Sequence, residues 1–139
     1  MDLTVFTKGQ LYKVLLMPRA YDDLYGSTMR PKKADGPAKS GLVGKHESSG
    51  AKNRSDVAGL FTRIRRYANT GKLKVPEHLN TEGNGFYAFK AYQLRAYWWR
   101  AGDTIIISHF AKKKRDELSP RDEATMARSK REFEEDSHD

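Results

Sequence analysis

The chain has 139 residues and a formal net charge of +8; 37% of its residues are hydrophobic and 32% are charged. This length predicts one domain, residues 1–139, with a modest core that leaves part of so polar a chain outside it. The absence of cysteine excludes disulfides, thiolate metal sites and cysteine nucleophiles. The excess of Lys and Arg favours nucleic acid as a partner, because clustered cations bind phosphates by releasing condensed counterions.

The sequence carries no signal for secretion or for a membrane. Its first residues show neither the basic head nor the small-residue cleavage site of a signal peptide, and no apolar run is long enough to span a bilayer. We therefore expect a cytoplasmic protein with no membrane partner.

The first third of the chain predicts a short ordered part followed by a polar insertion. Residues 9–17 form a dense apolar run that predicts a strand, and residues 20–25 predict one helical turn with solvated acidic side chains. Residues 27–54 are rich in Gly, Ser, Pro, Lys and Arg, so they offer little apolar surface to offset the entropy of ordering them. We expect a flexible basic insertion here that follows a phosphate backbone.

Residues 55–69 give the clearest helical pattern, with a cap at Ser55 or its neighbour and Gly71 as the C-terminal left-handed residue. Arg63 and Arg66 lie off the apolar face and are candidate RNA contacts. For Arg66 there is an equal alternative, because basic residues in the last turn complement the helix dipole. The apolar face itself is spaced for a helix: Val57, Leu60, Phe61, Ile64 and Ala68.

A loop is predicted at residues 71–84, and three strands then follow in close order at 86–91, 93–99 and 104–110. The last of them is apolar on both faces, which predicts a central position in the sheet. In the middle strand two sets of side chains alternate between the faces, Leu94, Ala96 and Trp98 on one and Gln93, Arg95, Tyr97 and Trp99 on the other. The two tryptophans are interpreted as core and sheet surface rather than as a base-stacking platform.

A last helix is expected from Ser119, which can cap it, with Pro120 at its first position and acidic residues in its first turn. Residues 130–139 are expected to form a frayed acidic tail. Together these elements predict an α+β fold in which a small, antiparallel-rich sheet packs with helices.

Residues 85–127 resemble the RelE/ParE superfamily of toxins from toxin–antitoxin systems, and within it the HigB-like, phage-derived branch. The resemblance lies in a joint arrangement of an arginine strand, a hairpin, an isoleucine strand, a basic cluster and a proline-led helix. In this chain these parts are Gly85-Phe86-Tyr87-Ala88-Phe89-Lys90, Leu94-Arg95-Ala96-Tyr97, Ile105-Ile106-Ile107-Ser108-His109-Phe110, Ala111-Lys112-Lys113-Lys114, and Pro120 with Ala124 and Ala127.

The chain departs from the family pattern in two places. The basic segment 27–54 intervenes where members often join two helices directly, and Ala88-Phe89-Lys90 stands where many have Glu-Leu-Arg. The second change keeps a cation but loses the guanidinium fork, which puts the role of Lys90 in doubt.

The resemblance implies an endoribonuclease that cleaves mRNA, free or on the ribosome, and that a cognate antitoxin protein neutralises. Enzymes of this type use no metal or other cofactor, because the 2′-hydroxyl of the substrate is the nucleophile. A base must then take the hydroxyl proton, cations must stabilise the phosphorane, and an acid must protonate the leaving 5′-oxygen. The few carboxylates in the hairpin region likewise disfavour metal-dependent hydrolysis.

Residue chemistry suggests a role for each candidate. Arg95 is the best phosphate clamp because its planar fork can pair two phosphate oxygens, and Lys90 adds charge beside it. His109 titrates near neutral pH and suits acid or base work, although a packing role suits it equally. The expected RNA contacts, by stacking or by charge, are Arg63, Arg66, Tyr92, Tyr97, Lys112, Lys113 and Lys114.

Two alternatives stay open. The same superfamily includes DNA gyrase inhibitors that are not nucleases and that typically lack a clustered set of catalytic cations. The other alternative is a non-catalytic module that binds RNA or DNA, which would show salt-dependent binding without cleavage.

Overall fold

A computed structural model describes residues 1–26, 41–43, 51–113 and 118–137 of the chain. Most of the expected basic insertion at 27–54 lies outside these residues, as does Lys114. No helix in the described ranges is long and apolar enough to cross a membrane.

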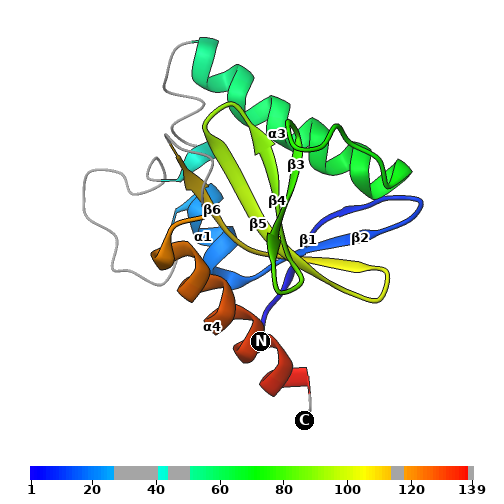
Figure 1. Ribbon diagram of the computed structural model, residues 1–139, viewed down its shortest axis with the longest axis vertical. Helices are drawn as coiled ribbons and strands as arrows, with labels where there is room; N and C mark the ends of the chain where they lie inside the picture. The colour runs from blue at the N-terminus through cyan, green and yellow to red at the C-terminus, as the bar shows by residue number, and fades with distance from the viewer. Residues whose placement is uncertain (27–40, 44–50, 114–117, 138–139) are drawn as a thin grey trace.

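The described chain folds as one mixed sheet with helices on both faces, which confirms the predicted α+β class (Figure 1). The six strands run in the order β1-β2-β6-β5-β4-β3, and every neighbouring pair is antiparallel except β2 and β6. The elements are β1 (Thr4–Lys8), β2 (Lys13–Leu16), α1 (Pro18–Tyr25), α3 (Ala51–Thr70), β3 (Leu79–Gly83), β4 (Phe86–Ala91), β5 (Leu94–Ala101), β6 (Thr104–Lys112) and α4 (Pro120–Ser137).

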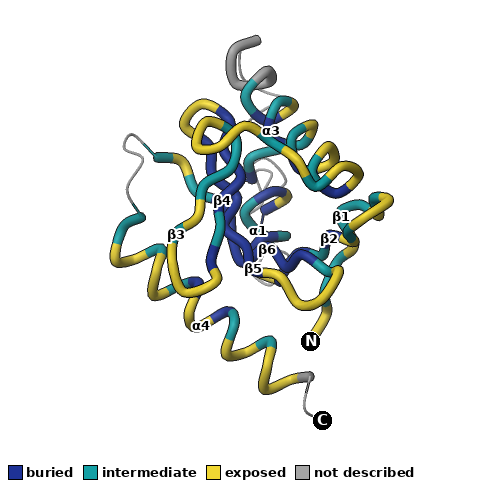
Figure 2. Tube along the Cα trace, turned by 45° about the vertical axis from the view of Figure 1, so that its right-hand side comes forward, coloured by how far each residue is buried: buried dark blue, intermediate teal, exposed yellow. Residues whose placement is uncertain are grey.

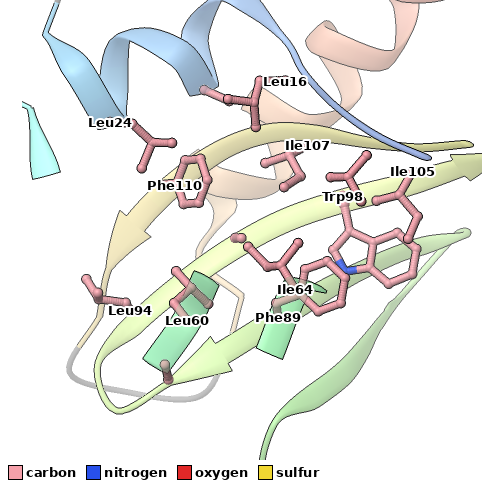
Figure 3. Close-up of a cluster of buried hydrophobic side chains, with 14 of the residues drawn as sticks. Leu16, Leu24, Leu60, Ile64, Phe89, Leu94, Trp98, Ile105, Ile107 and Phe110 are labelled. Atoms are coloured by element: carbon pink, nitrogen blue, oxygen red, sulfur yellow. The ribbon is translucent and has the colours of Figure 1, made fainter. Parts of the chain in front are cut away.

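The isoleucine strand β6 occupies an inner position, as its pattern predicts, and Ile105, Ile106 and Ile107 are fully buried. It is apolar on both faces because each face carries its own cluster of side chains. The larger cluster joins α1 and α3 to the sheet, with Leu24, Leu60, Ile64, Phe89 and Trp98 among its members (Figure 3). The smaller cluster joins α4 to the opposite face, with Met17, Tyr97, Trp99 and Met126 among its members.

Figure 2 shows the consequence of this layering: the middle parts of the inner strands are buried, while the outer sides of α3 and α4 are exposed. The predicted alternation along β5 is confirmed, because Leu94, Ala96 and Trp98 belong to the larger cluster and Tyr97 and Trp99 to the smaller. Both tryptophans are core residues, as expected.

Several boundaries differ from the predicted ones. The strands β1 and β3 were not predicted, and the strand expected at residues 9–17 is confined to Lys13–Leu16. The two missed strands each have an edge position and only partly buried side chains, so their sequences carry little apolar alternation. Helix α3 begins at Ala51, which places Ser55 inside the helix rather than at its cap.

The helix ends follow the predicted chemistry more closely. Gly71 follows α3 with a left-handed φ of 68°, and its N–H donates to the Tyr67 carbonyl. Ser119 caps α4, since its Oγ accepts from the Asp122 N–H at 3.1 Å. The helix continues to Ser137, through most of the range where a frayed tail was expected.

Candidate functional site

The strand register places five of the predicted residues on the sheet face that α4 covers. Lys90 lies opposite Arg95 across β4 and β5, and Tyr97 lies opposite His109 across β5 and β6. Arg95 and Tyr97 are two residues apart on β5, and Lys113 is four residues beyond His109, so all five share one face. We call this set, Lys90, Arg95, Tyr97, His109 and Lys113, the cationic face.

Tyr97 is the centre of the cationic face. Its ring stacks on the His109 ring with centroids 5.0 Å apart, and Lys113 Nζ lies 5.5 Å from its ring centroid. Burial, followed by the negative charge of Asp122, raises the pKa of Tyr97 far above its ordinary value. The phenol therefore keeps its proton at physiological pH, so it can donate or accept a hydrogen bond but carries no negative charge.

Asp122, in the first turn of α4, binds two members of the cationic face at once. Its Oδ1 lies 2.9 Å from His109 Nε2, and its Oδ2 lies 2.7 Å from Lys113 Nζ. The Ser119 hydroxyl donates to Oδ2 at 2.8 Å. Burial alone would raise the pKa of Asp122, but hydrogen bonds from Lys113, His109 and Ser119 outweigh it and lower that pKa.

His109 is neutral in this arrangement. Burial lowers the pKa of His109, and the hydrogen bond that the ring donates to Asp122 raises it by less. Because Asp122 is ionised, the ring proton belongs on Nε2, where it donates to Oδ1. Nδ1 is then free to accept the Ser108 hydroxyl proton at 2.9 Å.

The chain Ser108–His109–Asp122 has the composition of a hydrolase triad, but it cannot act as one. Ser108 is 0% exposed, so its hydroxyl cannot reach a substrate. It is the residue at which β6 slips in register against β5, since Tyr97 pairs with His109 and Trp98 with Ile107. These hydrogen bonds orient the imidazole, and nucleophilic attack by Ser108 is excluded.

The two other cations of the face are also largely enclosed. Lys90 is 8% exposed and Arg95 is 5% exposed. The Arg95 guanidinium donates from Nη1 to the carbonyls of Tyr92, at 2.7 Å, and Leu94, at 3.0 Å. Arg95 is therefore held against the β4–β5 turn.

A pocket of about 310 Å³ opens beside His109, between α1, α4 and the end of β6. Its charged lining comes from three elements: Arg19, Asp23, Lys112, Arg121 and Asp122. Asp23 accepts the Phe110 N–H at 2.9 Å, on the part of β6 beyond its pairing with β2, and burial raises its pKa. It thus has a structural role and is not the solvated surface residue that its sequence context predicts.

The remaining predicted contacts lie elsewhere. Arg63 and Arg66 belong to α3, on the face of the sheet opposite α4. Tyr92 is 64% exposed at the β4–β5 turn, and Lys112 is exposed beside the pocket. Arg100 is exposed at the far end of β5, where its guanidinium donates to the Tyr12 hydroxyl at 3.0 Å.

Sequence reasoning missed Arg19, Arg121 and the partnership of Asp122 with the cationic face. The spacing Ser119-x-x-Asp122 marks a helix start, which explains why the carboxylate was assigned to the helix dipole alone. Its second role depends on where α4 begins relative to the end of β6, which no local pattern encodes.

No group of three or more metal-ligating side chains occurs among the described residues. No protein-family model matches the chain, and no curated protein matches it either. The candidate chemistry therefore has to be argued from the residues themselves.

Proposed function

We propose that this protein acts on RNA through the cationic face, as a phosphate-binding enzyme that needs no metal. Within that class, we propose a RelE/HigB-like endoribonuclease that cleaves mRNA, free or on the ribosome, in the cytoplasm. It would be the toxin of a type II toxin–antitoxin pair. The observation that carries the proposal is the convergence of Lys90, Arg95, Tyr97, His109 and Lys113 on one face of the sheet.

In the proposed reaction the 2′-hydroxyl of the substrate attacks the adjacent phosphorus, and the bond to the 5′-oxygen breaks. Arg95, Lys90 and Lys113 would neutralise the charge that accumulates on the phosphorane oxygens. His109 would take the 2′-hydroxyl proton at Nε2 in the tautomer that carries its ring proton on Nδ1 and donates it to Ser108 Oγ. Tyr97 keeps its proton but is 1% exposed, so it would act as the acid toward the leaving oxygen only after the phosphate has displaced Asp122 from this face.

Asp122 has a defined place in this scheme. Its carboxylate occupies the positions near Lys113 and His109 that a substrate phosphate would take. A bound phosphate would replace Asp122 as the anionic partner of Lys113. Without the carboxylate the ring proton of His109 can move to Nδ1, and this leaves the Nε2 lone pair for the substrate hydroxyl. A cognate antitoxin would cover the same face and use the same charge complementarity.

The test compares induced expression of the wild type and Arg95→Ala in a bacterial host, with growth and mRNA 5′ ends recorded together. Arg100→Ala is the matched control, because it removes an arginine from the exposed far end of the same strand. We expect growth arrest with new mRNA ends in the wild type and in Arg100→Ala, and loss of both in Arg95→Ala. New ends that persist in Arg95→Ala would refute the assignment.

A second candidate, a non-catalytic nucleic-acid-binding module, is favoured by one observation. Lys90, Arg95 and His109 are each no more than 8% exposed, and Asp122 already engages His109 and Lys113. Purified protein that binds RNA without cutting it, in the presence of a chelator and in translating extracts, would support this reading. Growth arrest without new mRNA ends would instead point to a gyrase inhibitor.

A further inference from the structure

A second basic surface lies on the opposite face of the sheet from α4. It is a groove of about 510 Å³ between the C-terminal half of α3 and the segment that leads to β3. Its lining carries the cations Arg63, Arg66, Lys72 and Lys74, together with His78. We call these five residues the α3 groove; they share no residue with the cationic face.

The end of α3 explains how these cations come together. Gly71 lets the chain reverse after the helix, and the Thr70 hydroxyl accepts the Lys72 N–H at 3.2 Å. Leu73 then packs against the core, which leaves Lys72 and Lys74 exposed on either side of it. The reversal places both lysines beside the arginines of the last helical turns.

Both walls of the α3 groove are tied to one residue of β4. The Lys90 N–H donates to the His78 carbonyl at 2.8 Å, and the Lys90 carbonyl accepts from Arg63 Nη1 at 2.7 Å. These bonds fix the separation of α3 from the 72–78 segment, so the groove is built into the fold rather than formed by side chains that happen to meet.

The charged side chains that line the α3 groove are all basic. Of the described residues that line it, none is acidic, and within the described ranges no carboxylate forms an ion pair with its four Lys and Arg side chains. The pKa of His78 is lowered by partial burial and then by the charges of Arg63, Lys74 and Arg66, against a smaller opposing effect of Glu77.

An exposed aromatic ring adjoins the α3 groove. Tyr92 is 64% exposed and has a left-handed φ of 56° at the β4–β5 turn. The Arg63 guanidinium lies 5.9 Å from its ring centroid. An exposed ring beside a row of cations is the combination that binds unpaired bases by stacking and their backbone by charge, whereas the bases inside a duplex offer no face to the ring.

We propose that the α3 groove binds the phosphate backbone of single-stranded nucleic acid and that Tyr92 stacks on one of its bases. This site lies apart from the cationic face, and its occupancy requires no cleavage. Lys72, Lys74, Arg63 and Arg66 would contact the phosphates of the strand. Arg63 lies next to Tyr92, so it would be the cation nearest to the stacked base.

The test measures binding of a fluorescein-labelled 2′-O-methyl oligouridine of about 12 nucleotides to the full chain by anisotropy across a salt series. The 2′-O-methyl groups block attack by the 2′-oxygen, so a failure of the proposed nuclease leaves this measurement intact. The charge variant is Lys72→Ala with Lys74→Ala. Its matched control is Arg128→Ala with Arg131→Ala, which removes two exposed cations from α4 on the other face (Figure 1).

We expect the charge variant to bind about 10-fold more weakly and to reduce the slope of log affinity against log salt by roughly 1.4, about 0.7 for each lost phosphate contact. The α4 control should retain the wild-type affinity and slope. Tyr92→Ala should weaken single-strand binding by about 10-fold and leave the salt slope unchanged. A deoxyuridine strand should bind through the same residues, because the recognised groups are phosphates and base faces.

Three results would overturn the proposal. The first is equal loss in the charge variant and the α4 control. The second is duplex RNA that binds as tightly as the single strand, with no effect of Tyr92→Ala. The third is polyglutamate that displaces the strand equally well from the wild type and from Tyr92→Ala, which would identify an acidic protein as the partner. Thermal melting checks that each variant is folded.

Discussion

At the scale of single residues, the candidate site depends on one carboxylate. Asp122 holds His109 and Lys113 with two oxygens of the same group, and three donors converge on it. A buried cation is tolerated only where an anion or several acceptors face it, so Asp122 is what allows Lys113 to lie largely buried beside His109. In the proposed reaction, a substrate phosphate would have to displace this carboxylate from Lys113 and His109.

Replacement of Asp122 by Asn tests this role. We expect the free energy of unfolding to fall by about 1–3 kcal/mol, because charge-assisted hydrogen bonds from Lys113 and His109 are lost. The pKa of His109 should fall further, since Asp122 is the group that raises it. Urea unfolding and NMR titration of the His109 ring measure the two effects.

Glu123→Gln is the control for this variant. Glu123 is the exposed neighbour of Asp122 in the same helical turn, so the helix-dipole contribution of the two carboxylates is similar. If both variants change stability equally and leave the His109 titration in place, Asp122 acts only on the helix dipole.

Burial of His109 also makes the free energy of unfolding depend on pH. The pKa of His109 is lowered in the folded protein, so between that value and the ordinary histidine value of about 6.5 the unfolded chain binds more protons. This contribution is fully present above about pH 6.5 and is lost as the pH falls toward the folded pKa. The limiting slope for one proton is about 1.4 kcal/mol per pH unit.

We therefore expect His109→Gln to flatten the pH dependence of unfolding between about pH 7 and pH 5, after correction for a constant offset. Urea denaturation at several pH values provides the curves. Parallel curves for the wild type and the variant would show that burial of His109 does not carry this dependence.

At the scale of elements, close approach of backbones fixes how α3 meets the β1–β2 hairpin. The N–H groups of Leu11 and Tyr12 both donate to the Ala68 carbonyl at 2.9 Å. Gly9 lies so near the Ala68 backbone that a Cβ atom there would clash with it. The turn of the hairpin is thus hydrogen-bonded to the end of α3. Only glycine fits at residue 9, because a side chain there would collide with the Ala68 backbone.

Two glycine substitutions should have opposite effects for this reason. Gly9→Ala should destabilise by about 1–3 kcal/mol, because the hairpin must move away from α3. Gly59→Ala should stabilise by about 0.5–1 kcal/mol, since a Cβ at this helical position meets nothing within 4 Å and restricts the unfolded chain. Thermal and urea unfolding of both variants measure the signs; two changes of the same sign would contradict the packing at residue 9.

At the scale of the whole molecule, the two faces of the sheet are covered unequally. Helices α1 and α3 enclose the larger apolar cluster, whereas α4 packs on the other face through Met126 and Phe133 (Figure 1). Phe133 meets Trp99 edge-on with ring centroids 5.8 Å apart. A layer held by so few apolar side chains should open at lower free energy than the sheet beneath it.

Hydrogen exchange tests this difference. We expect the amides of α4 to exchange faster than those of β5 and β6. Phe133→Ala should speed exchange at residues 130–137 by about tenfold, which corresponds to loss of roughly 1–2 kcal/mol of apolar burial. Glu132→Ala, an exposed neighbour, is the control. Equal acceleration in β5 and β6 would show that α4 and the sheet open as one unit.

The sequence by itself determined the elements whose signal is local. Three apolar patterns identify the buried faces: the periodicity from Val57 to Ala68, the alternation along β5 and the isoleucine run of β6. Because a buried face must be apolar, each pattern is compatible with few secondary structures. The turn glycine at Gly71 and the cap at Ser119 follow from backbone chemistry within a few residues. The α+β class follows from these elements together.

Only the tertiary structure decided what depends on contacts between distant segments. The edge strands β1 and β3 owe their conformation to pairing rather than to their own sequences. Sequence identified Arg95, Lys90 and His109 as candidates by residue type, but their burial and their contacts with Asp122 and with backbone carbonyls arise from the packing of α4 and the β4–β5 turn. The physical reason is that a side chain's charge is local, whereas its partners and its access to solvent are set by what the fold brings against it.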